Sequence, residues 1–83
     1  MKILYFARLQ QIIGRGQEEI DVPADVKTVS ALIVYLKNQN KNIATAFADL
    51  RTLKVAINQS HASLDASLAR ATEVAFFPPV TGG

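Results

Sequence analysis

The chain has 83 residues, of which 49% are hydrophobic and 19% charged, so it is long enough for one compact domain and too short for two. Its net charge of +2 arises from scattered charges, and no basic stripe or aromatic–basic pattern indicates nucleic-acid binding. Cysteine is absent, which excludes disulfides, thiolate metal sites and a cysteine nucleophile. The apolar start is too short for a signal peptide or a membrane span, so we expect a cytoplasmic protein.

Hydrophobic periodicity predicts a mixture of strands and helices. The clearest helix begins after Thr28, because threonine is a favoured N-cap and the following apolar residues recur at the spacing of one helix face. Gly14 suits the left-handed end of a short first helix. Residues 60–68 fit either a short strand or an irregular connection. We expect strands over residues 2–7, 18–22, 53–57 and 73–77, and helices over residues 8–13, 29–36 and 43–50. An exit loop over residues 37–42 should follow the main helix, and a turn over residues 58–59 should follow the third strand.

This order predicts an α+β fold in which a small mixed sheet packs on one main helix, with short extra helices. We assign residues 1–77 to the globular domain and residues 78–83 to an extended C-terminal tail that ends in Gly-Gly. Pro78 and Pro79 lack backbone donors, so the sheet cannot continue past Phe77. The tail reaches roughly 20 Å at about 3.3 Å per residue, which is enough to enter a partner's cleft.

Charged residues indicate which strand faces are exposed. Lys2 in the first strand and Glu73 in the last should face water, and alternate side chains share their face. If the two strands are neighbours, this face forms one exposed apolar patch made of Leu4, Phe6, Ala75 and Phe77. Such a patch is typical of a partner surface. Chance exposure of aromatic residues in a small protein, or a dimer interface, are the alternatives.

The chain ends in two residues without side chains. Gly82 and Gly83 can pass through a channel too narrow for any other residue. The reactive group they offer is the α-carboxylate of Gly83, which is a poor electrophile until a nucleotide activates it. A terminal Gly-Gly alone is weak evidence, because frayed termini often finish in glycine. The order of strand, Phe-Phe, Pro-Pro and Gly-Gly is far more specific, and it predicts that the terminus is the reactive site.

The ending Glu73-Val-Ala-Phe-Phe-Pro-Pro-Val-Thr-Gly-Gly83 resembles that of the small subunits of molybdopterin synthase, a family of sulfur carriers with the ubiquitin-like β-grasp fold. Further matches are the opening strand into Phe6-Ala7, the Gly14 turn, the helix start at Thr28-Val29 and the segment Val55-Ala-Ile-Asn-Gln59. The resemblance spans the whole chain and is most specific at its end.

The resemblance implies a cycle of activation and transfer. An E1-like adenylyltransferase would activate Gly83 with ATP and magnesium, and a sulfur donor system would convert it to a thiocarboxylate. The large synthase subunit would receive the tail, and sulfur would pass to cyclic pyranopterin monophosphate in molybdenum cofactor biosynthesis. The chain itself would bind no cofactor or metal and catalyse nothing alone. It would be the non-catalytic small subunit of a sulfurtransferase, in a heterotetramer of two large and two small subunits.

The resemblance also implies which residues act or contact partners. Gly82 and Gly83 would be the reactive end, and Phe6 and Phe77 would lie in a hydrophobic contact shared by both partners. The other expected contacts follow the tail and the apolar patch: Leu4, His61, Ala75, Pro78, Pro79, Val80 and Thr81.

Two departures from the family pattern leave the edge of this interface open. Arg70-Ala71-Thr72 stands where relatives usually have a glycine beside an acidic residue, and His61 stands where they often have an apolar contact residue. Ser60, His61 and Asp65 include the residue types of a nucleophile triad, but neighbouring side chains in a strand point apart, so we do not expect catalysis there. The acidic residues show no spacing typical of a metal site.

Other functions stay open beside the leading one. The chain could carry sulfur for another pathway, such as thiamine thiazole synthesis, or modify proteins by joining lysines through Gly83. The spacer Phe-Phe-Pro-Pro-Val-Thr favours the molybdopterin branch. A different class of function is a non-covalent interaction module that uses only the apolar patch.

Overall fold

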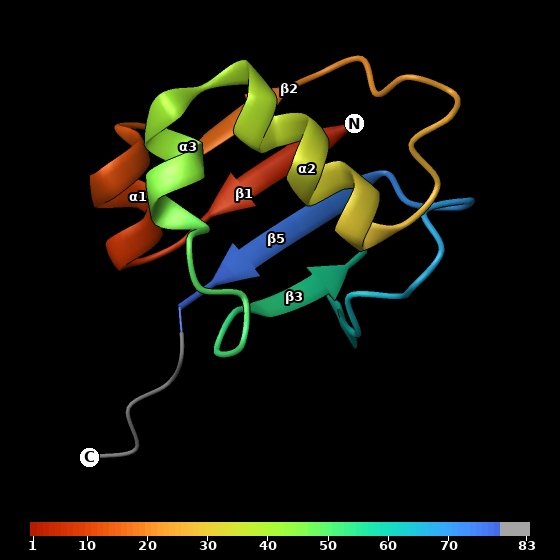
Figure 1. The fold of residues 1–83 in the computed structure, drawn as a ribbon. Coiled ribbons are helices and arrows are strands. Elements are labelled where there is room, and N and C mark those ends of the chain that lie inside the picture. Colours follow the sequence, from red (N-terminus) through yellow and green to blue (C-terminus); the bar gives the residue numbers. More distant parts are fainter. Residues whose placement is uncertain (79–83) are drawn as a thin grey trace.

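A five-stranded mixed sheet forms the frame of the fold, in a computed structural model that describes residues 1–78. The strand order is β2-β1-β5-β3-β4, and the central β5 runs parallel to β1 and antiparallel to β3 (Figure 1). The strands are β1 (Lys2–Tyr5), β2 (Gln17–Glu19), β3 (Lys54–Ile57), β4 (Ser60–Ala62) and β5 (Glu73–Phe77). The predicted α+β class is therefore confirmed.

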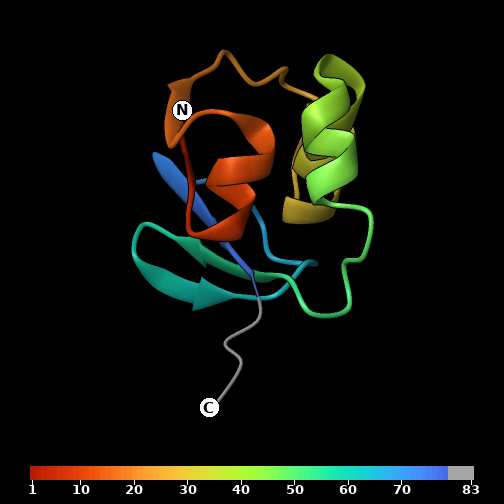
Figure 2. The ribbon, with the colours of Figure 1, turned by 90° about the vertical axis from the view of Figure 1, so that its left-hand side faces the viewer.

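Three helices cover one side of this sheet, as the two views at right angles show (Figures 1 and 2). They are α1 (Arg8–Ile13), α2 (Val29–Gln39) and α3 (Lys41–Ala46). Their buried apolar residues join those of the strands in a single core, in which Tyr5, Phe47 and Phe76 are the largest fully buried side chains. The longest helix within residues 1–78 has 11 residues, and none there is long and apolar enough to cross a membrane.

The main helix forms as the sequence predicts. Thr28 has an extended backbone, and its hydroxyl oxygen accepts a hydrogen bond from the backbone N–H of Ala31 at 3.2 Å. The four apolar residues at helical spacing, Val29, Leu32, Ile33 and Leu36, are all buried. Gly14 ends α1 with φ 91°, in the left-handed region that glycine tolerates best.

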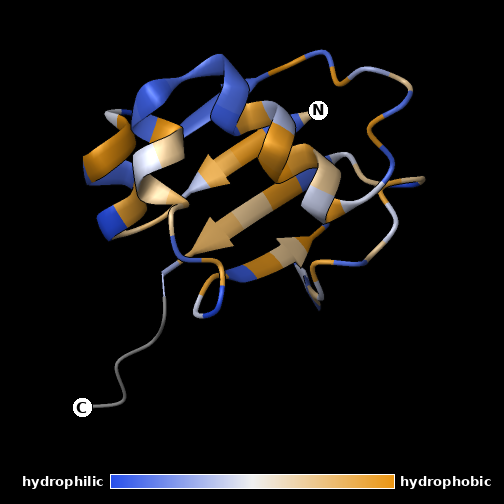
Figure 3. Ribbon diagram, viewed as in Figure 1, coloured by the Kyte–Doolittle hydropathy of each residue, from blue (hydrophilic) through white to orange (hydrophobic). Residues whose placement is uncertain are grey.

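The loop predicted over residues 37–42 is wrong, because this segment is helical on both sides of a single residue. Asn40 is extended, with φ −154° and ψ 124°, and it separates α2 from α3. Its side-chain oxygen accepts hydrogen bonds from the backbone N–H groups of Asn42, at 2.7 Å, and Ile43, at 3.4 Å. The junction is hydrophilic in Figure 3, so polarity there reflects an exposed helix cap rather than a loop. The second short helix also ends earlier than predicted, at Ala46.

The second strand is shifted from its predicted position. It covers Gln17–Glu19 because its partner β1 offers only Lys2–Leu4 for pairing. Ile20 makes a last hydrogen bond to the carbonyl of Met1, where the partner strand begins, so residues 20–22 have no strand beside them. Residues 60–68 combine both possibilities left open, since β4 ends at Ala62 and an irregular connection follows.

Tyr5, the more buried of the two tyrosines, forms a hydrogen bond with a carboxylate. The Tyr5 hydroxyl donates to Glu18 Oε2 at 2.6 Å, and Arg15 pairs with Glu18 Oε1 at 3.2 Å. Burial, followed by this hydrogen bond and the negative charge of Glu18, raises the pKa of the Tyr5 phenol well above its ordinary value. The hydrogen bond between Tyr5 and Glu18 therefore holds β2 against the core only while the Tyr5 phenol is protonated.

The raised pKa predicts a specific loss of stability in alkali. Because the folded state holds the phenol neutral, its contribution is complete below the unfolded pKa of about 10 and is lost as the pH rises above that value. The chain has two tyrosines, so a Tyr35→Phe variant keeps only Tyr5. As the pH of this variant is raised, tyrosinate absorbance should appear together with unfolding, which circular dichroism measures. Ionisation near pH 10 in a protein that is still folded would contradict this assignment.

Candidate docking face and tail root

The side of the sheet away from the helices carries a surface pocket, which we call the open face. Its predicted members Leu4, Phe6, Ala75 and Phe77 come together there, and so does His61. Glu73 lies there too, as its parity predicts. Sequence reasoning missed three further residues, although the alternation of Lys54 and Ala56 in β3 was a signal for two of them. The residues that line the open face are Leu4, Phe6, Lys54, Ala56, Gln59, His61, Glu73, Ala75 and Phe77.

Strand register explains why these residues share one face. Leu4 lies opposite Ala75 across the β1–β5 pair, and Lys54 lies opposite Phe77 across the β3–β5 pair. Core and open-face residues alternate along β5, as the parity argument predicts. One detail differs, since Ala75 is only 5% exposed because its small side chain sits in the central strand between its neighbours. The apolar surface of the open face is therefore supplied mainly by the longer side chains of β1 and β5.

Two aromatic rings form the edge of the open face where the tail begins. The rings of Phe6 and Phe77 are nearly parallel, at 4° between planes and 4.8 Å between centroids. The parallel pairing of β1 and β5 brings their C-terminal ends to the same edge of the sheet, so this contact follows from topology. Phe6 remains 39% exposed, which is unusual for a large apolar side chain in contact with another.

The backbone directly after Phe6 is strained. Ala7 has φ 51° and ψ −128°, and the N–H of Leu9 donates to the carbonyl of Phe6 at 3.1 Å. This is the geometry of a type II′ turn, whose first central residue is normally glycine. A side chain in such a conformation costs about 1–3 kcal/mol. The turn ends β1 and starts α1 without moving Phe6 from the open face.

Pro78 is the last residue that the structure describes, and we call it the root of the tail. It lines a second pocket together with α1, the end of α3 and the segment after α3, including Arg8, Leu9, Thr45 and Asp49. The predicted tail contacts Pro79, Val80 and Thr81 and the reactive Gly82 and Gly83 lie outside the described residues. The division into a domain of residues 1–77 and a tail of residues 78–83 therefore stays a prediction.

The hairpin turn between β3 and β4 lies against the segment that precedes β5. Asn58 and Gln59 both have positive φ, 49° and 72°, as a two-residue β-hairpin turn requires. The Asn58 side-chain oxygen accepts hydrogen bonds from the N–H groups of Thr72, at 2.9 Å, and Glu73, at 3.1 Å, and its amide donates to the Arg70 carbonyl at 2.9 Å. Asn58 thus fixes the segment before β5, whose geometry the sequence left open.

The residues weighed for catalysis do not form a site. His61 lines the open face, whereas Ser60 and Asp65 do not, as the alternation of strand side chains predicts for Ser60. Among residues 1–78, no group of three His, Asp or Glu side chains is placed to hold a metal ion. At the open face, the described part of the molecule therefore offers a surface for binding.

Relief of the strain at Ala7 is measurable. Replacing Ala7 by glycine should remove about 1–3 kcal/mol of strain and lose about 0.5–1 kcal/mol to backbone entropy, so we expect Ala7→Gly to stabilise the fold by about 1 kcal/mol. The matched control is Ala44→Gly in α3, which should destabilise by about 1 kcal/mol. Both changes are read from urea unfolding. A loss of stability in Ala7→Gly equal to that of the control would contradict the assigned strain.

The chain is similar to known proteins both in sequence and in fold. A sequence model of the ThiS family matches residues 3–83. The "Molybdopterin synthase sulfur carrier subunit" of Escherichia coli strain K12 is 42% identical over 83 residues, with 100% of this chain and 99% of that protein covered. The protein of the same name from Haemophilus influenzae is 35% identical over the same coverage. Among solved structures, the H. volcanii small archaeal modifier protein 1 has a TM-score of 0.76 at 27% identity, with 95% of each chain covered, in agreement with the ubiquitin-like β-grasp fold.

Proposed function

The chain belongs to the ThiS family, and on that premise we propose that it is the sulfur carrier subunit of a molybdopterin synthase. The observation that supports this most strongly is the 42% identity to the Escherichia coli carrier over essentially the full length of both chains. The ending Phe-Phe-Pro-Pro-Val-Thr-Gly-Gly gives the same assignment from the residues themselves. The chain is then one subunit of a sulfurtransferase and contributes a reagent rather than catalytic side chains.

The proposed reagent is the α-carboxylate of Gly83. An E1-like adenylyltransferase, using ATP and magnesium, joins this carboxylate to AMP and releases pyrophosphate. A sulfur nucleophile at the oxidation level of sulfide, delivered by the donor system, then attacks the acyl carbon and displaces AMP. The product is a thiocarboxylate, which supplies sulfur to cyclic pyranopterin monophosphate. Since the chain has no cysteine, its terminus is the group left to hold sulfur covalently.

The open face offers each partner the same binding surface. Phe6 and Phe77 lie together at the edge from which the tail leaves, so a protein that covers them holds the root of the tail in a fixed place. We therefore propose that the large synthase subunit and the adenylyltransferase use this face in turn, in the cytoplasm. A heterotetramer of two large and two small subunits completes the proposed assembly.

A second candidate function is modification of proteins. The observation in its favour is the fold likeness to a protein named as a small archaeal modifier. Both functions begin with adenylation of Gly83 and differ in the group that attacks the acyl carbon, which is sulfur in one case and a lysine amine in the other. Sulfur carriage for another pathway would share the first steps and differ in the receiving protein. A non-covalent module would skip adenylation altogether.

Mass spectrometry of the terminus tests the chemistry. Protein produced with its adenylyltransferase, ATP and a sulfur source should gain the mass difference between sulfur and oxygen, localised to the C-terminal peptide. Deleting Gly83, or adding one residue after it, should abolish this gain while circular dichroism stays native, because the core lies within residues 1–78. Conjugates at lysines would favour the modifier, and an unchanged mass of the wild type would reject both.

Docking on the open face is tested separately. Phe77→Ser should weaken binding to the large synthase subunit by about 2 kcal/mol or more, roughly 30-fold, as for a central aromatic anchor. Val34→Ser is the matched control, because Val34 is 59% exposed on α2, away from the open face. Calorimetry measures both affinities. Equal effects of the two substitutions would show that the open face is not the docking surface.

A further inference from the structure

The charges around the root of the tail specify what its partner should look like. We propose that the protein which receives the tail carries carboxylate side chains around the mouth of its cleft, where they pair with a cationic collar on this chain. The collar consists of Arg8 and Lys54. This inference rests on the proposed function, and it specifies the chemistry of the partner surface.

Lys54 is the central member of the collar. It is exposed, it lies directly opposite Phe77 in the β3–β5 pair, and it lines the open face. A partner that covers Phe77 must therefore also cover Lys54 or lie against it. Among residues 1–78 no carboxylate forms an ion pair with Lys54. Covering a lysine without an anion is costly, so the partner has to supply one.

Arg8 stands on the other side of the tail root. It begins α1 and lines the pocket that also contains Pro78. Asp49 belongs to the same pocket, but its carboxylate receives two hydrogen bonds from the Arg51 guanidinium, each 3.0 Å long. These bonds hold the pKa of Asp49 below its ordinary value and show that its charge is already matched. Arg8 has no ion pair within the described part of the chain, so this side too is left with a positive charge.

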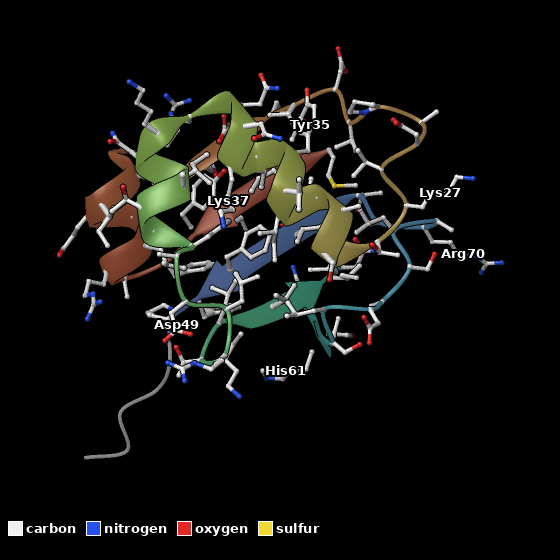
Figure 4. The ribbon with its side chains drawn as sticks, in the orientation of Figure 1. Lys27, Tyr35, Lys37, Asp49, His61 and Arg70 are labelled. Carbon is white, nitrogen blue, oxygen red and sulfur yellow. The ribbon has the colours of Figure 1, made fainter. Side chains whose placement is uncertain are left out.

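His61 lies on β4, the strand next to β3, which carries Lys54. It pairs with Ala56 across the β3–β4 hairpin and projects from the underside of the sheet in Figure 4. Lys54 stands two residues before Ala56 in β3, so the two side chains point to the same side of the sheet. Lys54 and His61 therefore both lie on the open face.

The acidic residue that lines the open face is too distant to neutralise the collar. Glu73 begins β5, whereas Phe77 ends it, which separates the two by roughly 13 Å at about 3.3 Å per residue. Glu73 instead lies beside Lys2 in the β1–β5 pair. Among residues 1–78, the acidic residue of the open face therefore leaves Lys54, at the other end of that face, without a carboxylate partner.

Charge reversal with a matched control tests the collar. Lys54→Glu and Arg8→Glu are compared with Lys27→Glu, which changes the net charge equally at an exposed residue. Lys27 lies on the opposite side of the molecule from Asp49, which lines the same pocket as Arg8 and Pro78 (Figure 4). Binding to the purified large synthase subunit of the same organism is measured by calorimetry at low and high salt. At low salt we expect each collar variant to bind about tenfold more weakly and to lose much of the salt dependence, whereas Lys27→Glu stays within about twofold of the wild type.

Each other outcome has a defined meaning. Wild-type affinity in Lys54→Glu, or an equal loss in Lys27→Glu, overturns the collar and leaves the proposed function standing. Tighter binding of Lys54→Met would show that the partner is apolar at this point, which also overturns it. Absence of wild-type binding to the large subunit overturns the collar together with the proposed partner. Circular dichroism of each variant confirms that the comparison concerns folded protein.

Discussion

The parallel pairing of β1 with β5 is the constraint on which the rest of the structure depends. It joins the first and last strands of the chain in the centre of the sheet, and it places their C-terminal ends at the same edge. Phe6 and Phe77 meet there as a result, although 71 positions separate them in sequence. β5 ends at this edge, so Pro78, the last residue that the structure describes, follows directly after the aromatic pair.

The two faces of the sheet have different tasks. Helices cover the face that holds Tyr5 and Phe76, and their packing supplies the stability of the domain. The other face keeps apolar side chains without helices over them and has charged residues at its rim. In the proposed function, the open face binds one partner after another while the core stays intact, because the core and the open face lie on opposite sides of the sheet.

Much of this arrangement was predictable from local patterns. The main helix followed from Thr28 and the apolar residues after it, the left-handed cap followed from Gly14, and the open face followed from the parity of Lys2 and Glu73. These predictions succeeded because each depends on short-range periodicity or on the backbone preference of one residue. The polar stretch around Asn40 was misjudged, since the same residues suit a loop and a pair of helix ends.

The sequence by itself determined the class of fold, the core residues of the main helix, the composition of the tail and the family to which the chain belongs. Only the tertiary structure decided that Asn58 fixes the segment before β5, that Ala7 turns with a strained backbone, and that Lys54 and Arg8 flank the root of the tail. These features either join residues that are distant in sequence or depend on how the strands pair. Their register depends on the whole sheet, which no local pattern encodes.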